Sequence, residues 1–274
     1  MAGKIYVVGT PIGNLSDLSP RAAEVLSGVD FIAAEDTRVT AKLLNRFGIK
    51  KETVSYYEHN KAQKGEYLIS RVLAGEDLAI VSDAGMPAIS DPGEDIVRQA
   101  HENGITVESV PGPSALISAL SISGFPSGRF CFEGFLSVNR ISRTKHLEEL
   151  KGETRTMIFY EAPHKLLRTL GDMLAAFGER EICIVKELTK IHETVYHFTF
   201  TSAIEFFETD PPKGEYVVII KGADKEKEKN ALTLTEAQNL AKRLMSEGMS
   251  ASSAAKEAAA ASGFKKGEIY KAII

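Results

Sequence analysis

The segment VSDAGMPAISDPG, residues 81–93, decides how this chain is expected to fold and where its ligand site is expected. It follows the apolar run DLAIV (77–81), which is typical of a buried strand. The segment contains two aspartates, two prolines and two glycines. Glycine frees the backbone and proline fixes it, so this density of both residues favours a loop whose main chain itself contacts a ligand.

The segment divides into a turn and a helix start. Gly85 allows a tight turn that brings main-chain groups close to a ligand. Asp91 is predicted to be a helix N-cap, with Pro92 in the first helical position and Glu94 closing a capping box. The loop PGPSA (111–115) has the same character, which suits an extended, largely neutral ligand. The alternative for either loop alone is a tight turn between a strand and a helix, without a binding role.

Apolar runs alternate with helical patterns along the chain. The first series comprises residues 4–9, 29–35, 77–82, 105–110 and 129–134. Strands that are covered on both faces are nearly continuous apolar runs, so we expect an α/β domain with a mostly parallel sheet. The second series comprises residues 154–162, 181–187, 193–200 and 214–222, and its last pairs are expected to be antiparallel. A polar segment, 136–153, separates the two series, which predicts α/β domains at 1–136 and 137–224.

Four strand ends of the first series share a chemical character. Their loops are GTPIGNL (9–15), EDTR (35–38), the segment 81–93 and PGPSA (111–115). Ligands of open α/β sheets bind outside the carboxyl ends of the strands, so we expect these loops to converge on one cleft.

Composition places the chain among ordinary globular proteins. It has 274 residues, 43% hydrophobic and 26% charged residues, and no apolar run near the ~20 residues that a membrane helix needs. Its start is not typical of a signal peptide, and the two cysteines, Cys131 and Cys183, are far apart in the sequence. A cytoplasmic protein is the simplest interpretation.

Several common site types are absent from the sequence. GTPIG does not match the dinucleotide-binding glycine pattern, and neither a phosphate-binding P-loop nor a G-x-S-x-G nucleophile motif occurs. The run HETVYH (192–197) is one residue too long for the zinc motif H-E-x-x-H and lies in a strand-like context. We therefore expect no metal.

The C-terminal segment 225–274 has nine Lys/Arg against six Asp/Glu, although the net charge of the whole chain is −4. A charged linker is expected to begin it, and three short helices to follow at 232–274. Ala259, Gly263 and Ile269 have the spacing of a helix-turn-helix, which favours contact with nucleic acid. A solvated, alanine-rich helical cap remains the alternative.

A series of motifs then becomes recognisable in order along the chain. These are VGTPIGNLSDLSPRA, AAEDTR, SYYEHN, VSDAGMPAISDPG, PGPSALISAL, FEGFL, FYEAPHKL, KELTK and GEYVVII. The chain resembles the tetrapyrrole-methylase-like (class III) methyltransferases. Among them, it is similar to the bacterial enzymes that methylate the ribose 2′-oxygen of a cytidine in the decoding region of 16S ribosomal RNA.

The resemblance implies two α/β domains with a cleft between them, S-adenosylmethionine as the methyl donor, and a homodimer. The residues implied to contact the cofactor are Pro11, Ile12, Gly13, Asp83, Ala84, Gly85, Met86, Ser114, Ala115, Tyr160, Glu161 and Ala162. The RNA, or the small ribosomal subunit that contains it, is the implied partner.

Methyl transfer to a ribose hydroxyl depends on positioning and is helped by a general base. The candidate bases near strand ends are Glu35, Asp36 and His59, although the two acids could instead pair with Arg38 or cap a helix, and His59 could be a plain loop residue. The basic residues considered as RNA contacts are Arg38, Arg140, Arg143, Lys145, Lys265 and Lys266.

Two other functions stay open at this point. One is a methylase of a tetrapyrrole or another small molecule on the same fold, against which the basic C-terminal segment argues. The other is a non-enzymatic nucleic-acid-binding regulator, in which the body of the protein senses a metabolite.

Overall fold

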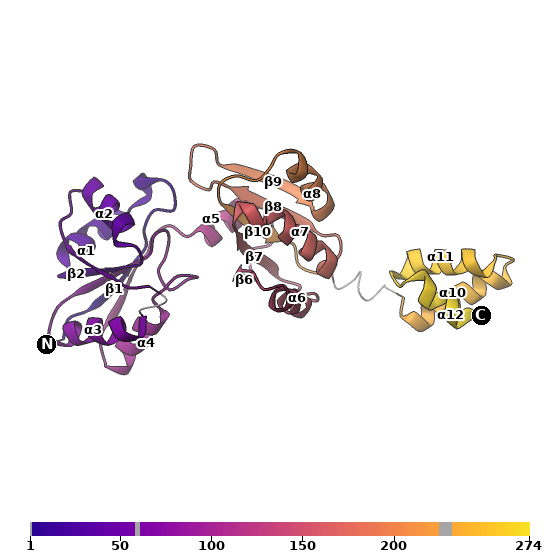
Figure 1. The fold of residues 1–274 in the computed structure, drawn as a ribbon, viewed down its shortest axis with the longest axis horizontal. Coiled ribbons are helices and arrows are strands. Elements are labelled where there is room, and N and C mark those ends of the chain that lie inside the picture. Colours follow the sequence, from indigo (N-terminus) through magenta and orange to yellow (C-terminus); the bar gives the residue numbers. More distant parts are fainter. Residues whose placement is uncertain (1, 58–60, 225–231) are drawn as a thin grey trace. The chain divides into compact units, whose positions relative to one another are not determined.

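A computed structural model describes residues 2–57, 61–224 and 232–274, and the side chains of all of these except residues 61–63. The chain divides into two compact units, residues 1–221 and 222–274 (Figure 1). The first unit contains two five-stranded sheets, and the second is helical. No helix in the described part of the chain is long and apolar enough to cross a membrane.

The first sheet is parallel throughout and has the strand order β3-β2-β4-β1-β5. Its strands are β1 (Ile5–Val8), β2 (Phe31–Ala34), β3 (Glu52–Ser55), β4 (Leu78–Val81) and β5 (Val107–Val110). This order makes β4, β1 and β5 neighbours, so the three loops that follow them leave the same part of the carboxyl edge. The predicted convergence of these loops therefore has a topological cause.

Helices cover both faces of the first sheet. Its helices are α1 (Pro20–Gly28), α2 (Thr37–Arg46), α3 (Lys61–Leu73) and α4 (Glu94–Glu102). Leu26 of α1 and Leu44 of α2 are buried in one core, and Leu68 of α3 and Ile96 of α4 in another. Burial on both faces explains why the inner strands β2 and β4 are uninterrupted apolar runs.

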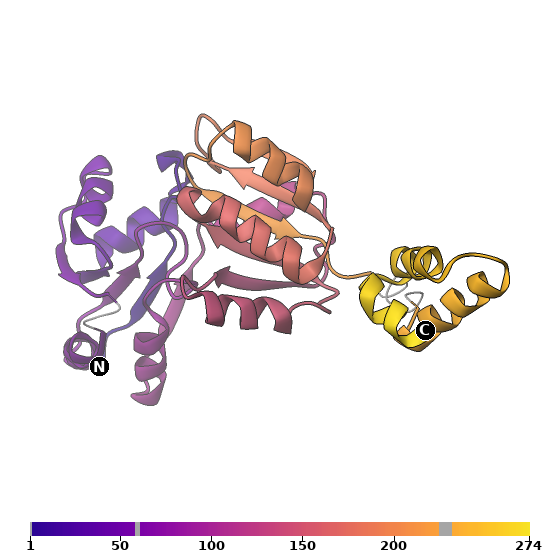
Figure 2. The same ribbon diagram turned by 45° about the vertical axis from the view of Figure 1, so that its right-hand side comes forward.

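The second sheet is mixed and has the order β6-β7-β10-β8-β9. Its strands are β6 (Phe130–Phe135), β7 (Thr156–Glu161), β8 (Glu181–Lys186), β9 (Thr194–Thr199) and β10 (Tyr216–Ile220). Only β6 and β7 pair in parallel, and the other neighbours are antiparallel, as expected from the more alternating pattern. One face carries α5 (Ala115–Ile122), and Figure 2 shows the helices of the other face, α6 (Arg140–Glu149), α7 (Pro163–Phe177) and α8 (Phe200–Thr209).

Two strands differ from the expectation. The run at 129–134 was predicted to belong to the first sheet, but β6 pairs with β7 in the second, so the division between the sheets falls before β6 rather than after residue 136. Strand β3 was not predicted. It is a partly exposed edge strand of sequence ETVS, and half-exposed edge strands lack the long apolar run that marks a buried one.

The second unit consists of the three expected helices, α10 (Leu234–Ser246), α11 (Ala251–Ser262) and α12 (Lys266–Ile273). Its small core is made mostly of alanines from α10 and α11, together with Ile269 of α12. Gly263 ends α11 with φ +75°, a left-handed conformation that glycine adopts without strain, and this turn separates α11 from α12. The charged residues 225–231 lie outside the described residues.

Candidate active site

The loops after β1 and β4 are joined by main-chain hydrogen bonds. The Thr10 N–H donates to the Gly85 carbonyl over 2.9 Å, and the Gly85 N–H donates to the Thr10 carbonyl over 3.1 Å. Gly85 has φ +90°, which a residue with a side chain would adopt only under strain. The tight turn expected at Gly85 is therefore present, and it anchors the segment 81–93 to the neighbouring loop.

The loops after β1 and β5 touch through bare backbone. A Cβ atom on Gly9 would lie 2.7 Å from the Cα atom of Gly112 and 2.6 Å from the sulfur of Met86. Glycine at these positions is thus required by close approach. The three loops form one braced group at the carboxyl edge of the sheet.

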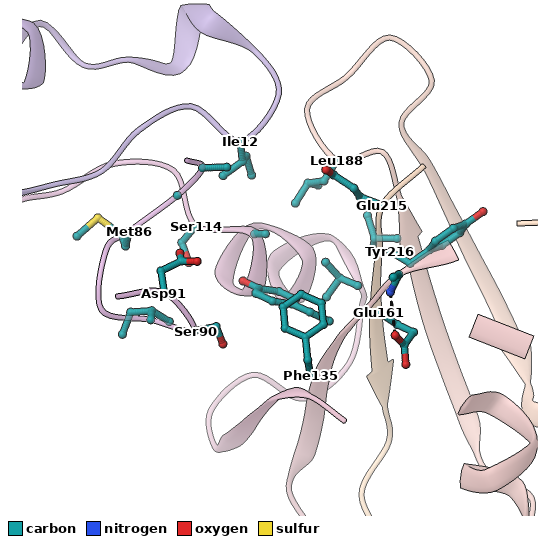
Figure 3. A pocket seen from close by; sticks show the side chains of 18 of the residues that line it. Ile12, Met86, Ser90, Asp91, Ser114, Phe135, Glu161, Leu188, Glu215 and Tyr216 are labelled. Atoms are coloured by element: carbon teal, nitrogen blue, oxygen red, sulfur yellow. Dashed lines mark hydrogen bonds between the residues drawn. The ribbon is translucent and has the colours of Figure 1, made fainter. Parts of the chain in front are cut away.

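A cavity of about 360 Å³ opens beside this group (Figure 3). One wall comes from the loops of the first sheet, and the other from α5 and from residues at and near the ends of β6, β7, β8 and β10. The lining residues are Ile12, Ala84, Gly85, Met86, Ile89, Ser90, Asp91, Ser114, Ala115, Phe135, Tyr160, Glu161, Ala162, Pro163, Val185, Leu188, Glu215, Tyr216 and Val217. A mostly apolar lining with few polar groups, and this volume, are typical of small-molecule sites.

The aromatic side chains of Phe135 and Tyr160 line the cavity, and Phe132 contacts Tyr160. Tyr160 meets Phe132 at 4.9 Å between ring centroids and Phe135 at 5.5 Å, both in edge-to-face geometry. The Tyr160 hydroxyl accepts a hydrogen bond from the Leu116 N–H, at 2.9 Å, in the first turn of α5. Burial raises the pKa of Tyr160 to about 12, so the phenol stays neutral.

Three carboxylates line the cavity, and two of them are bound to other groups of the protein. Glu161 is buried and accepts hydrogen bonds from the Thr169 hydroxyl at 2.5 Å and the Ala162 N–H at 2.8 Å. Glu215 pairs with the Lys190 ammonium at 2.8 Å. Both groups therefore hold the second wall in place.

Asp91 is the third carboxylate, and its surroundings favour a bound cation. Burial raises its pKa to about 6, the negative charges of Glu35 and Asp83 add to the effect, and a hydrogen bond from the Ser82 hydroxyl opposes it. Asp91 forms no ion pair with any residue that the structure describes. A half-buried carboxylate without a cationic partner is a favourable place for the positive charge of a ligand.

The loop that carries Asp91 is strained. Ala88 and Ser90 have φ values of +67° and +64°, a region that residues with side chains rarely adopt. Such strain persists only where the surroundings enforce it, and it is concentrated at functional sites. Here it lies within the pocket wall, since Ile89, Ser90 and Asp91 all line the cavity.

Comparisons with known proteins show which family the chain is similar to. The family model of the tetrapyrrole (corrin/porphyrin) methylases matches residues 4–204. A ribosomal RNA small subunit methyltransferase I from Synechocystis sp. is 43% identical over 270 residues, covering 98% of this chain and 96% of the relative. One from Thermotoga maritima is 46% identical over 222 residues, covering 81% of this chain and 100% of the relative. A solved structure of diphthine synthase, at 14% identity, has a TM-score of 0.61 and covers 80% of this chain and 90% of its own.

This chain belongs to the ribosomal RNA small subunit methyltransferase I family of the tetrapyrrole methylases. The two-sheet α/β fold expected from the resemblance is confirmed. Members of this methyltransferase family use S-adenosylmethionine, and the cavity is large and polar enough at Asp91 to accommodate that cofactor.

Most residues that family resemblance assigned to the cofactor line this cavity. They are Ile12, Ala84, Gly85, Met86, Ser114, Ala115, Tyr160, Glu161 and Ala162. Pro11, Gly13 and Asp83 do not line it and instead brace the loops around it. Pro11 is buried, and the Asp83 carboxylate accepts a hydrogen bond from the Asp36 N–H at 3.1 Å, which ties the β4 loop to the β2 loop.

Gly13 lies against the connection between β8 and β9. A Cβ atom on it would come within 2.8 Å of the Thr189 hydroxyl oxygen and 2.7 Å of the Lys190 Cγ atom. The GTPIG loop therefore reaches the second wall, and Ile12 is placed over the cavity between them.

Part of the site was not predicted from the sequence. The prediction that Asp91 caps a helix is wrong, because α4 begins at Glu94 with Gly93 as its N-cap and has no side-chain cap. The other residues missed are Ile89, Ser90, Phe135, Pro163, Val185, Leu188, Glu215, Tyr216 and Val217. Most of these come from the second sheet, whose strand order cannot be read from local sequence patterns.

The three candidate bases have different surroundings. Burial, together with Asp83 and Asp36, raises the pKa of Glu35, as suits a base that must exchange a proton. Asp36 caps α2 and binds the Arg38 guanidinium, which lowers its pKa to about 2. That arrangement favours the capping role over that of a base. His59 lies outside the described residues.

The candidate RNA contacts include one that the structure contradicts. Arg143 is buried, and its guanidinium binds the Asp172 carboxylate at 2.7 Å and the carbonyls of Ser137 and Val138. It therefore joins α6 to α7 and presents no free face to a phosphate. The other basic residues predicted to contact RNA are exposed: Arg38, Arg140, Lys145, Lys265 and Lys266.

Among the described residues there is no group of three or more His, Cys, Asp or Glu side chains arranged to hold a metal ion. His192 lies outside β9 and His197 within it, so the run HETVYH has the strand-like context that the sequence indicated.

Proposed function

We propose that this chain transfers a methyl group from S-adenosylmethionine to the ribose 2′-oxygen of a cytidine in the decoding region of 16S ribosomal RNA. The observation that carries the proposal is the cavity that ends at Asp91, in a chain whose relatives of 43% and 46% identity are named ribosomal RNA small subunit methyltransferase I. The Asp91 carboxylate in the cavity lining, which has no ion-pair partner among the described residues, suits a cationic cofactor.

The cofactor would lie against the braced loops and the Tyr160 ring. The main chain of Ala84 to Met86 and the Ser114 hydroxyl would serve its amino-acid part, and Asp91 would face its positive charge. When bound, the cofactor supplies an electrophilic methyl group on a sulfonium. Pro11, Gly13 and Asp83 would act through the loops they brace.

The protein's own contribution is positioning, exclusion of water and proton removal. The Tyr160 ring, together with Ile12 and Leu188, would make a wall that keeps water from the cofactor. Glu35 is proposed as the group that accepts the proton of the ribose hydroxyl, since burial raises its pKa and makes it a stronger base than an exposed carboxylate. In-line approach of the hydroxyl then supplies much of the remaining rate.

RNA contact is assigned to exposed basic residues on both units. Arg38, Arg140 and Lys145 belong to the first unit, and Lys265 and Lys266 to the second. The Thermotoga maritima relative is aligned over its full length to 81% of this chain, so about a fifth of this chain has no counterpart there. We infer that the second unit strengthens RNA binding without taking part in the chemistry.

A homodimer and a cytoplasmic location, where small ribosomal subunits are assembled, complete the proposal. Both follow from the family resemblance. Sedimentation at micromolar concentration would test the dimer directly.

The experiment combines tritiated S-adenosylmethionine with small subunits from cells that lack this protein, followed by mass spectrometry of nuclease fragments. Label on a single 2′-O-methylcytidine is the expected result. Cofactor binding without RNA labelling would favour a small-molecule methylase, and a lack of cofactor binding would contradict both.

A further inference from the structure

Phe135 combines two properties that rarely occur together. It lines the cavity, and yet 57% of its surface is exposed. In the view of Figure 3, its ring lies between Ser90 and Asp91 on one side and Glu161 on the other. A planar apolar face is therefore presented to whatever approaches the cofactor from solvent.

The backbone is shaped to place this ring. The pairing of β6 with β7 shifts register between Phe132 and Gly134, and Gly134 has φ +62°. Bulges of this kind re-aim the side chains that follow them and are common next to active sites. Gly134 also approaches the β4 loop so closely that a Cβ atom would lie 3.2 Å from the Ser90 hydroxyl oxygen.

The ring is supported from behind. Tyr160 contacts it edge-to-face with an interplanar angle of 63°, and Tyr160 is itself fixed by the Leu116 N–H and by Phe132. A ring held in this way loses little conformational freedom when a second planar group stacks on its free face.

We propose that the exposed face of Phe135 stacks on the base of the target nucleotide and so holds its ribose at the cofactor. The inference rests on the proposed function and names the residue that would position its substrate. Sequence-tolerant stacking on aromatic side chains is the usual way in which proteins hold unpaired bases. The exposed Arg140, five residues further along at the start of α6, would meet the adjoining phosphate.

Three substitutions test the proposal. Phe135→Leu keeps an apolar side chain but removes the planar face, Phe135→Tyr keeps the face, and Val138→Ala changes a neighbouring exposed apolar residue that does not line the cavity. Each variant is assayed for methylation of small subunits and, by calorimetry, for binding of S-adenosylmethionine, after its folding has been checked by thermal unfolding.

Removal of the stack is expected to lower kcat/KM for small subunits by about tenfold or more in Phe135→Leu, mainly through KM. Phe135→Tyr and Val138→Ala are expected to match the original protein, and all three should bind S-adenosylmethionine normally. A Phe135→Leu variant with normal kcat/KM would overturn the proposal, as would a parallel loss of cofactor affinity. If the unsubstituted protein labels no RNA, the proposed function itself fails and this inference with it.

Discussion

Asp91→Asn is expected to weaken cofactor binding and, at the same time, to stabilise the cofactor-free protein. The pKa of Asp91 is about 6 in the folded protein against an ordinary 3.8. Each pKa unit corresponds to about 1.4 kcal/mol, so the ionised carboxylate costs up to about 3 kcal/mol at neutral pH, and about 1–2 kcal/mol after screening by solvent at this half-buried position. Asparagine avoids that cost.

The sign of the pH dependence follows from the raised pKa. The folded protein binds a proton at Asp91 more readily than the unfolded chain does, so the cost is small below about pH 4, grows between 4 and 6, and is complete above 6. In urea unfolding, the gain in free energy of unfolding from Asp91→Asn should therefore be larger at pH 7.5 than at pH 5. Acids that do not interact with Asp91 titrate equally in both proteins and cancel in the difference.

Asp91→Asn should lower the affinity for the cofactor, although it raises the free energy of unfolding. Only the ionised form of Asp91 attracts a cation, so the affinity of the unsubstituted protein for S-adenosylmethionine should fall by about tenfold between pH 7.5 and pH 5. The charged and titratable groups around Asp91 are Glu35, Asp83 and the neutral Tyr160, and these are unchanged in the variant. Asp91→Asn should bind weakly, with little dependence on pH in calorimetry.

The control is Glu94→Gln, which removes a charge from the exposed start of α4, three residues away and outside the cavity. It should leave cofactor affinity unchanged. If Asp91→Asn destabilises the protein at pH 7.5, Asp91 is a structural residue and the argument fails. The prediction would also be contradicted if the affinity of Asp91→Asn for S-adenosylmethionine depended on pH as steeply as that of the unsubstituted protein.

Three further predictions concern the loops, the base and the second unit. Gly9→Ala should lower the free energy of unfolding by roughly 1–3 kcal/mol in urea, because its Cβ would meet Gly112 at 2.7 Å, whereas Gly28→Ala, with nothing within 4 Å, should not. Glu35→Gln should lower kcat for RNA methylation by on the order of a hundredfold while leaving cofactor affinity intact, and normal turnover would exclude it as the base. Deletion of 225–274 should raise KM for small subunits and flatten its dependence on salt without changing kcat, and an unaltered salt dependence would contradict a role of the second unit in RNA binding.

The sequence predicted those features that depend on local pattern and on family resemblance. Buried strands such as β4 were visible as apolar runs, and the convergence of the loops followed from the rule for parallel sheets. The membership of β6 in the second sheet was not visible, because an apolar run does not state its partner strand. For the same reason the second wall of the cavity, including Glu215 and Leu188, could not be assigned.

Asp91 shows why a correct local pattern can give a wrong role. The run Asp-Pro-Gly-Glu satisfies the rules for a helix start, with Asp91 as the cap and Pro92 in the first helical position. In the structure α4 begins without a side-chain cap, because the Asp91 carboxylate lines the cavity instead. With Gly93 as the N-cap, the missing side-chain cap costs only about a few tenths of a kcal/mol, and the left-handed conformations at Ala88 and Ser90 add to that cost.

These local costs have one structural explanation. The strained segment is fixed at its start by the Gly85–Thr10 hydrogen bonds and by the bond from the Asp36 N–H to Asp83, so it cannot relax toward an ordinary turn. The sheet cores on either side supply the stability that keeps it in place. A carboxylate held in this way is oriented before the ligand arrives, so binding need not organise it. The bare backbone of residues 84–86 and the Asp91 carboxylate, which does not cap α4, are therefore two parts of the same preformed cavity wall, which is the site proposed for the cofactor.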